Sequence, residues 1–149
     1  MKALIQRVTE GSVTIDGEIA GQINKGYVVL LGVRHGDTLD DAATLARKTS
    51  GLRIFPDEDD RMRHDIRDVG GNILVISQFT LYASTRKGNR PGFSGAADPE
   101  LAEACYEHYV AALMSDLGKD RVETGRFGAM MSVKIINDGP VTIELTTDD

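Results

Sequence analysis

The sequence predicts an α/β protein with mixed, largely antiparallel β-sheets and about two helices packed on one side, in a three-layer arrangement with a barrel-like core. Roughly eight stretches have the composition of β-strands, and two have the three- and four-residue spacing of amphipathic helices. Strands and helices do not alternate regularly along the chain. A purely parallel sheet built from βαβ units is therefore not expected.

The chain has 149 residues and a net charge of −6. A chain of this length buries roughly 70% of the surface that its unfolded form exposes, so we expect a single domain, residues 1–149. The charge argues against a broad positive surface that coats nucleic acid, but it is compatible with a local basic patch. The single Cys105 cannot form an internal disulfide, and no signal peptide or long apolar run is visible. We therefore expect a soluble cytoplasmic protein with no membrane contact.

The first third of the chain reads mainly as β-structure. A bend or bulge at Glu10-Gly11 separates the expected strands 3–9 and 12–15, and Asp16-Gly17 is a strong hairpin signal. Residues 27–33 are almost entirely apolar, which is typical of a strand buried on both faces. The expected strands are residues 3–9, 12–15, 18–20 and 27–33.

Thr38 has the position of an N-cap, and two aspartates in the following turn favour a helix that ends at Gly51. Residues 52–55 are expected to form a short strand that Pro56 ends. The acidic run at 57–60 suggests a cation site, but it lacks the spacing of a calcium loop. A solvated surface loop is the favoured interpretation.

The second helix has the clearest boundaries: Asp98 as N-cap, Pro99 at the first position and Gly118 beyond the end. Apolar residues at helical spacing define its buried stripe, which makes Cys105 a core residue rather than a nucleophile. The stripe comprises Leu101, Cys105, Tyr109, Ala112, Leu113 and Leu117. The last expected strands are residues 121–124, 129–136 and 141–147.

The most apolar run, residues 73–76, predicts another buried strand, and it ends in the polar side chains of Ser77, Gln78 and Thr80. Polar groups at the carboxyl end of a rigid strand can be directed at a ligand. A hydrogen-bonded polar edge without function is the alternative. The second conspicuous stretch is 137–140, Asn-Asp-Gly-Pro, which is either part of the same site or a hairpin turn between two strands.

Arg86, Lys87 and Arg90 form the one compact basic patch, and nearby glycines would allow the backbone to approach a phosphate. We interpret it as a contact to substrate phosphates, with a solvated loop as the alternative. His35, His64 and His108 have no evident partners, and no Ser/His/Asp set, cysteine pair or metal-spaced histidine cluster is visible. An enzyme with so few bases must rely on positioning, on hydrogen-bond donors or on a group of its substrate.

Five motifs in this order resemble the D-aminoacyl-tRNA deacylase family, also called the D-tyrosyl-tRNA deacylase family. They are residues 4–8 (LIQRV), 77–83 (SQFTLYA), 85–88 with 90–91 (TRKG and RP), 123–129 (ETGRFGA) and 137–142 (NDGPVT). Met130, Met131 and the acidic tail read as individual variation. The resemblance implies a homodimeric editing hydrolase that cleaves D-amino acids, or glycine, from the 3′ end of tRNA.

The resemblance also assigns roles. It implies that Gly139-Pro140 is cis and enters the pocket of the partner subunit, where its backbone excludes L-amino acids while glycine passes. It places residues 77–80 at the scissile ester, with Arg7 fixing the Gly-Pro segment. The implied catalytic residues are Gln78, Phe79 and Thr80; the substrate-binding residues are Ser77, Gly139, Pro140 and Arg7; the expected tRNA contacts are Arg86, Lys87 and Arg90. No metal or cofactor is expected.

Two mechanisms remain open. Thr80 could attack the ester, although no base to activate it is evident. We favour attack by water assisted by the 2′-hydroxyl of the terminal adenosine, with backbone N–H groups around Phe79 and Thr80, and Gln78, stabilising the oxyanion. A non-catalytic RNA-binding module and a general esterase with Thr80 as nucleophile are the alternative functions.

Overall fold

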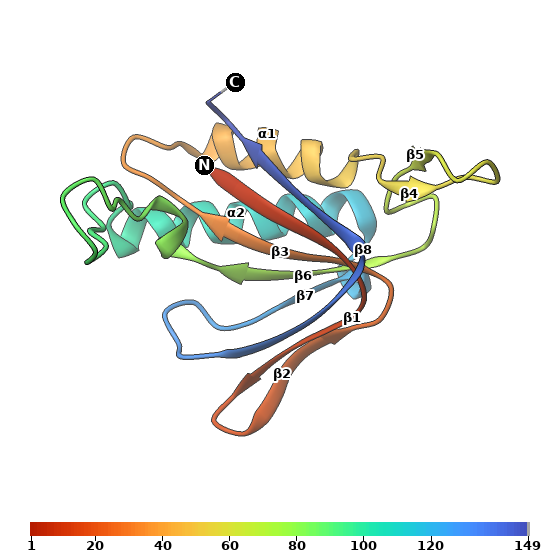
Figure 1. Cartoon of the computed structure of the whole chain (residues 1–149), viewed down its shortest axis with the longest axis horizontal. Helices are drawn as coiled ribbons and strands as arrows, with labels where there is room; N and C mark the ends of the chain where they lie inside the picture. Colours follow the sequence, from red (N-terminus) through yellow and green to blue (C-terminus); the bar gives the residue numbers. More distant parts are fainter. Residues whose placement is uncertain (149) are drawn as a thin grey trace.

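The computed structural model describes residues 1–148. Figure 1 shows a strongly twisted sheet with two long helices on one side. The helices are α1 (Leu39–Ser50) and α2 (Pro99–Leu117), and the short 3-10 helices are η1 (Phe79–Tyr82) and η2 (Lys119–Arg121). The strands are β1 (Lys2–Ile15), β2 (Glu18–Ile23), β3 (Gly26–Gly32), β4 (Phe55–Pro56), β5 (Met62–His64), β6 (Asn72–Ser77), β7 (Val122–Thr124) and β8 (Ser132–Thr146).

The main sheet has the order β2-β1-β3-β6-β7, and β8 also pairs with β1. The pairs β3/β6 and β6/β7 are parallel, whereas β1 is antiparallel to β2, β3 and β8. The long strand β1 thus joins two parts of the sheet, which curls into a nearly closed, barrel-like form (Figure 1). The predicted fold class is confirmed.

Strand β1 is continuous, so the prediction of two strands was wrong. The register against β8 is irregular between Val8 and Glu10, close to the expected bulge, but pairing continues on both sides of it. Gly11 serves packing instead of a bend: a Cβ atom there would lie 2.6 Å from Cγ2 of Val28. The hairpin at Asp16-Gly17 is confirmed, and both residues have positive φ angles, 51° and 81°.

Both helices begin and end where the sequence predicts. The Thr38 hydroxyl accepts a hydrogen bond from the Asp41 N–H at 3.2 Å, and the Asp41 carboxylate accepts one from the Thr38 N–H at 2.9 Å. This reciprocal capping starts α1. The buried residues of α2 are Cys105, Tyr106, Tyr109, Val110 and Leu113, so the predicted stripe omitted Tyr106 and Val110. Leu101, Ala112 and Leu117 are only partly buried against the core.

Strands β3 and β6 are buried on both faces, as predicted. The larger core lies between the sheet and the helices, and a smaller one fills the opposite face. The smaller core consists of Val8, Val13, Ile23, Val28, Leu74 and Ile76. Because both faces of these strands are packed, the position of their carboxyl ends is well fixed.

The predicted strand at 52–55 was wrong: only Phe55 and Pro56 are in β-structure, and they pair with the unpredicted β5. The acidic run forms the connecting turn. The Asp57 carboxylate accepts hydrogen bonds from the N–H groups of Arg61 and Asp59. These bonds, and above all the one from Arg61, hold the pKa of Asp57 below its usual value. Within residues 1–148, no group of three or more His, Cys, Asp or Glu residues is placed to hold a metal ion.

The two strands predicted at 129–136 and 141–147 are one continuous strand, β8, which spans Ser132–Thr146. Both halves pair with β1: Asn137 lies opposite Val8, and Thr142 lies opposite Gln6. The four residues 138–141 therefore face the single residue Arg7 and bulge out of the strand. The Asn-Asp-Gly-Pro stretch is not a hairpin turn, because the chain continues along the same partner strand beyond it.

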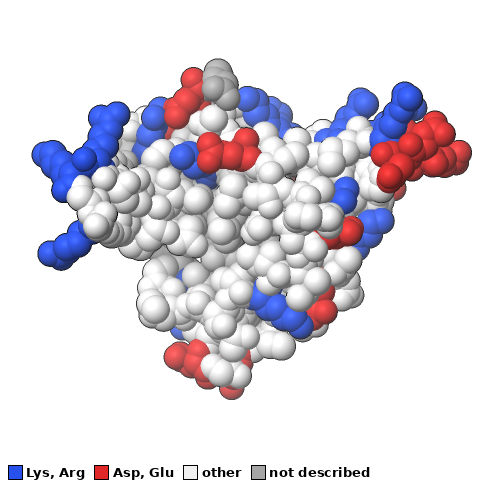
Figure 2. All heavy atoms as spheres, viewed as in Figure 1, with Lys and Arg blue, Asp and Glu red and all other residues white. Residues whose placement is uncertain are grey.

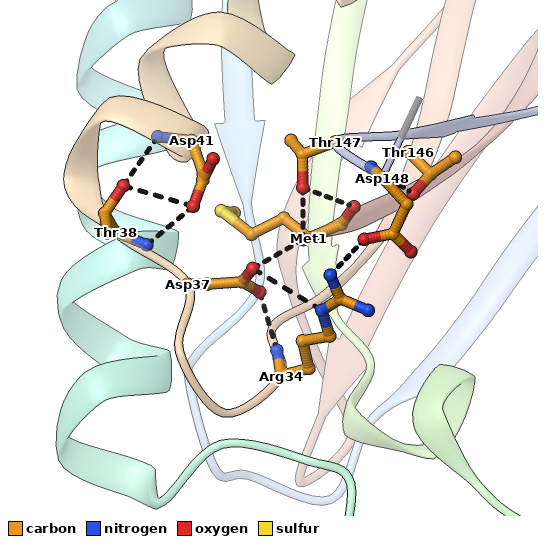
Figure 3. A network of polar contacts seen from close by, with 8 residues as sticks. All are labelled: Met1, Arg34, Asp37, Thr38, Asp41, Thr146, Thr147 and Asp148. Atoms are coloured by element: carbon orange, nitrogen blue, oxygen red, sulfur yellow. Dashed lines mark hydrogen bonds and ion pairs between the residues drawn. The ribbon is translucent and has the colours of Figure 1, made fainter.

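The two ends of the described chain are tied together (Figure 3). The Met1 ammonium is fully buried and donates hydrogen bonds to Asp37 Oδ1 at 2.9 Å and to Thr147 Oγ1 at 2.7 Å. Asp37 also accepts a bond from the Arg34 N–H at 2.7 Å, and Arg34 pairs with Asp148. The network anchors β1 and β8 beside the start of α1. No helix within residues 1–148 is long and apolar enough to cross a membrane.

Candidate active site

A cleft of about 740 Å³ lies at the carboxyl ends of β3 and β6. These strands are parallel, with Leu31 opposite Ser77, so both ends meet at one edge of the sheet. Residues of the loop before α2 and of the segment 127–131 complete the walls, which are mostly apolar. A cleft of this volume is within the range of small-molecule binding sites.

Ser77, Gln78 and Phe79 line the cleft, as the sequence predicts for a site at this strand end. The Gln78 N–H donates to the Leu31 carbonyl at 2.8 Å, which fixes the chain as it leaves β6 for η1. Thr80 does not line the cleft itself. Its hydroxyl accepts a hydrogen bond from Gln78 Nε2 at 2.5 Å, so the two side chains act as a unit at the rim.

The N–H groups of Phe79 and Thr80 donate no hydrogen bond to any of residues 1–148. They begin a 3-10 helix, where the first backbone donors have no partner within the helix. Unpaired donors next to a cleft are what stabilisation of a developing negative charge requires.

The apolar wall was largely missed by sequence reasoning. The Phe79 side chain is 54% exposed and packs edge-on against Phe93, with ring centroids 5.1 Å apart. Phe127 and the pair Met130-Met131 also line the cleft, and Met130 is 91% exposed. The two methionines, read from sequence as individual variation, are thus cleft residues. The only sequence signal for this wall was the neighbouring motif at 123–129, to which no role was assigned.

The bulge of β8 is held from two sides. Arg7 Nε donates to the Asp138 carbonyl at 2.9 Å, and Arg7 Nη1 donates to the Ile54 carbonyl at 2.6 Å. Inside the bulge, the Val141 N–H donates to Asn137 Oδ1 at 2.7 Å. The peptide bond between Gly139 and Pro140 is cis, as the resemblance implies, and both residues are exposed.

The structure does not bring all predicted site residues together in one chain. Arg7, Gly139 and Pro140 are not among the residues that line the cleft. The cleft and the bulge are therefore separate features of the single chain. A site that uses both would need a second subunit.

Arg86, Lys87 and Arg90 are exposed in the loop between η1 and α2. This loop is closed by two 2.8 Å backbone hydrogen bonds between Ser84 and Gly92, and the next residue, Phe93, lines the cleft. Within residues 1–148 no carboxylate forms an ion pair with any of the three cations. Lys and Arg atoms gather at the left of Figure 2, where Figure 1 places this loop. The basic patch therefore adjoins the cleft.

The remaining candidates for chemistry are two of the histidines and Cys105. His35 lines the cleft, and His64 lies 3.6 Å from Asp68 Oδ2, so the expectation that no histidine has a partner was wrong for His64. Burial raises the pKa of the Cys105 thiol. A buried thiol of raised pKa packs as a core residue and is a poor nucleophile, as predicted.

The fold and the cleft define a mixed-sheet α/β protein with a mostly apolar cleft at the carboxyl ends of two parallel strands. The chain belongs to the family described as D-Tyr-tRNA(Tyr) deacylase, whose model matches residues 4–146. This confirms the family that the five motifs indicated.

Relatives match over nearly their full length. The D-aminoacyl-tRNA deacylase of Thermus aquaticus is 51% identical over 152 residues, covering 100% of this chain and 97% of the relative, and that of Halalkalibacterium halodurans is 54% identical over 143 residues, covering 96% and 97%. Among solved structures, the c-Myc DNA unwinding element binding protein superposes with a TM-score of 0.94 at 41% identity over the whole of both chains. A probable eukaryotic D-amino acid tRNA deacylase superposes with a TM-score of 0.83 at 14% identity, covering 97% of each chain, which shows a shared fold.

Proposed function

We propose that this chain hydrolyses the ester bond of D-aminoacyl-tRNA, and of mischarged glycyl-tRNA, and so acts as a chiral editing enzyme in the cytoplasm. The observation that carries the proposal is the pair of unpaired N–H groups at Phe79 and Thr80 beside a mostly apolar cleft. Membership of the deacylase family and the names of its relatives support the same activity.

Ester hydrolysis passes through a tetrahedral intermediate whose oxygen carries negative charge. The N–H groups of Phe79 and Thr80 stabilise this oxyanion, and the Gln78 amide, held by the Thr80 hydroxyl, assists. The attacking water is activated by the 2′-hydroxyl of the terminal adenosine. This assignment suits a site in which the Thr80 hydroxyl has Gln78, which is no base, as its hydrogen-bond partner among the described residues.

We further propose that chiral selection comes from a partner subunit. The Gly139-Pro140 bulge of one subunit enters the cleft of the other, and its backbone leaves no room for the side chain of an L-amino acid. Two features support this: the bulge is exposed and held by Arg7, and it does not line the cleft of its own chain. Glycine, which has no side chain, is hydrolysed as well.

The basic patch of Arg86, Lys87 and Arg90 binds phosphates of the tRNA near its 3′ end. Its position supports this, because the same loop supplies Phe93 to the cleft wall. Replacing the three residues by Ala weakens binding of D- and L-acylated tRNA alike, since phosphate contacts do not read the amino acid. Unchanged affinity would refute this role.

Turnover of D-tyrosyl-tRNA by substoichiometric enzyme tests the activity. Release of D-tyrosine with L-tyrosyl-tRNA left intact is expected, whereas binding without release would indicate an RNA-binding module. Hydrolysis of simple activated esters that lack a ribose would instead indicate a general esterase.

The chemistry is tested with tRNA that ends in 2′-deoxyadenosine. It is expected to bind but to be deacylated at least ~100-fold more slowly, the scale of one acid–base contribution. Thr80→Ala retains substantial activity on normal substrate. A trapped acyl-Thr80 adduct, or normal turnover of the deoxy substrate, would overturn the 2′-hydroxyl mechanism.

A further inference from the structure

A second groove, of about 730 Å³, lies beside the carboxyl end of α1. Leu52 and Leu145 contribute its apolar surface, and Arg47, Lys48 and Arg53 line it with exposed cationic side chains. Figure 2 shows Lys and Arg atoms along the upper edge of the molecule, over α1 and next to the red acidic loop. We call Arg47, Lys48 and Arg53 the groove cations.

The groove cations are not neutralised. Within residues 1–148 none of them forms an ion pair, and Arg47 donates only to Thr44 Oγ1, at 3.2 Å. Arg47 and Lys48 lie in the last turn of α1, where the negative end of the helix dipole stabilises cations, and this explains why basic residues occur there. It does not account for Arg53, which lies beyond the helix. Three unpaired cations around one groove in a chain of net charge −6 fit an anionic ligand.

The backbone that carries Arg53 is fixed on both sides. The Tyr27 hydroxyl donates to the Leu52 carbonyl at 3.0 Å, and Arg7 Nη1 donates to the Ile54 carbonyl at 2.6 Å. Tyr27 is fully buried and stacks on Phe55, with ring centroids 5.2 Å apart. Arg53 is therefore presented to solvent from a rigid base, which reduces the entropy lost when it binds a ligand.

The segment that carries Arg53 is tied to the bulge that contains Gly139 and Pro140. The Arg7 guanidinium donates both to the carbonyl of Ile54, which follows Arg53, and to the carbonyl of Asp138, which precedes Gly139. In the proposed dimer this bulge meets the 3′ end of a tRNA bound in the partner's cleft. Arg53 then lies beside the side of the site at which that 3′ end is proposed to bind.

We propose that the groove cations bind the phosphate backbone of the tRNA acceptor arm, as a second contact area besides Arg86, Lys87 and Arg90. This inference rests on the proposed function, since it takes tRNA as the ligand. The two areas belong to opposite sides of the composite site: the patch at 86–90 adjoins the cleft, and the segment that carries Arg53 is tied to the bulge. An acceptor arm held from both sides has its 3′ end aligned in the cleft.

The test compares the wild type with the triple variant Arg47→Ala/Lys48→Ala/Arg53→Ala. Binding of uncharged tRNA is measured across a range of potassium chloride concentrations. Loss of three phosphate contacts reduces the slope of log affinity against log salt by about 2 to 3, and it weakens binding roughly 10- to 100-fold at low salt. The matched control Arg61→Ala/Arg67→Ala/Lys119→Ala removes the same charge from exposed positions outside both areas and changes the slope by less than about 1.

Two substrates separate the outcomes. On D-tyrosyl-tRNA the groove variant loses kcat/KM in parallel with its affinity, whereas on the 3′ ester of D-tyrosine with adenosine, which has no acceptor arm, it equals the wild type. Wild-type affinity and slope in the variant, or equal losses on both substrates, would overturn the role of the groove. A wild type inert on both substrates would instead defeat the proposed function. Arg53→Glu alone, which leaves α1 intact, is expected to give the same direction of change.

Discussion

At the residue scale, Arg7 connects parts of the chain that are far apart in sequence. Its guanidinium, with the side chain 12% exposed, donates to the carbonyls of Asp138 and Ile54 and lies 3.7 Å from the Asp138 carboxylate. A planar group with several donors in fixed directions can hold two carbonyls at once. Arg7 thus positions the bulge without contributing to the cleft.

Arg7→Lys tests this positioning role. Lysine keeps the charge, but a single ammonium on a flexible stem cannot replace both hydrogen bonds. We expect the preference for D- over L-tyrosyl-tRNA to fall ~10-fold, the value of about one charged hydrogen bond, while the protein stays folded. The readout is kcat/KM on both enantiomers. Arg67→Lys, at an exposed arginine paired with Asp65, is the control, and an unchanged preference in Arg7→Lys would refute the role.

Asp37 is the buried counter-ion of the Met1 ammonium (Figure 3). Asp37→Asn leaves that ammonium buried without an opposite charge, and we expect the free energy of unfolding to fall by ~3 kcal/mol. Urea denaturation measures the change. Glu58→Gln in the exposed acidic loop is the control with the same loss of charge, and it is expected to have an effect below ~0.5 kcal/mol. Equal effects in the two variants would contradict the importance of the terminal network.

At the element scale, the cleft depends on the parallel pair β3/β6, whose register starts with Gly26 opposite Asn72. Gly26 has a φ angle of +154°, and a Cβ atom there would lie 1.8 Å from the Asn72 carbonyl oxygen. No side chain can relieve this overlap, since the obstacle is backbone. Glycine at this position allows the two strands to approach closely where their pairing starts. The same register places Leu31 opposite Ser77 at the other end of the pair.

Gly26→Ala is expected to cost at least ~3 kcal/mol, because the strands must separate to admit the methyl group. Thermal unfolding followed by circular dichroism checks this, together with the soluble yield. Gly92→Ala provides the control: the nearest atom to its added Cβ, the Ser84 carbonyl oxygen, would be 3.9 Å away. A Gly26→Ala protein as stable as the Gly92→Ala control would show that Gly26 and Asn72 are not close-packed.

At the scale of the whole molecule, all four tyrosines have raised pKa values. Burial is the main cause in each case, and it raises the pKa of Tyr82 and of Tyr106 to about 12. The hydroxyls of Tyr106 and Tyr109 are also held by hydrogen bonds, to the Val75 carbonyl at 3.0 Å and to Thr49 Oγ1 at 2.8 Å. Burial therefore favours the neutral phenol at all four positions.

The folded protein is expected to show little tyrosinate absorbance at pH 10.5, where the unfolded chain, with tyrosine pKa near 10.0, is more than half ionised. Because the folded pKa values lie above the unfolded ones, the unfolded state releases protons first as pH rises. Stability is therefore undiminished by the tyrosines below about pH 10 and falls between about pH 10 and 12. Absorbance at high pH, with and without urea, checks both statements. Native tyrosines titrating near pH 10 would contradict them.

The sequence by itself determined the features that depend on near neighbours. The cap at Thr38, Pro99 at the start of α2 and the Asp16-Gly17 hairpin act within a few residues, so local composition predicts them. The apolar run at 73–76 likewise predicted a strand buried on both faces, and two of the polar residues after it, Ser77 and Gln78, line the cleft. The motifs also identified the family, which covers residues 4–146.

Only the tertiary structure decided which distant segments meet. The Asn-Asp-Gly-Pro stretch has the composition of a hairpin turn, yet it bulges from β8 because Gln6 and Val8 pair on either side of it. The wall formed by Phe93 and Met130 and the cations around the second groove likewise join segments that are separate in sequence. Local periodicity reports which face of an element is apolar, but not which element packs on it. That choice is made by the packing of the whole core, so the composite surfaces became visible only in the folded chain.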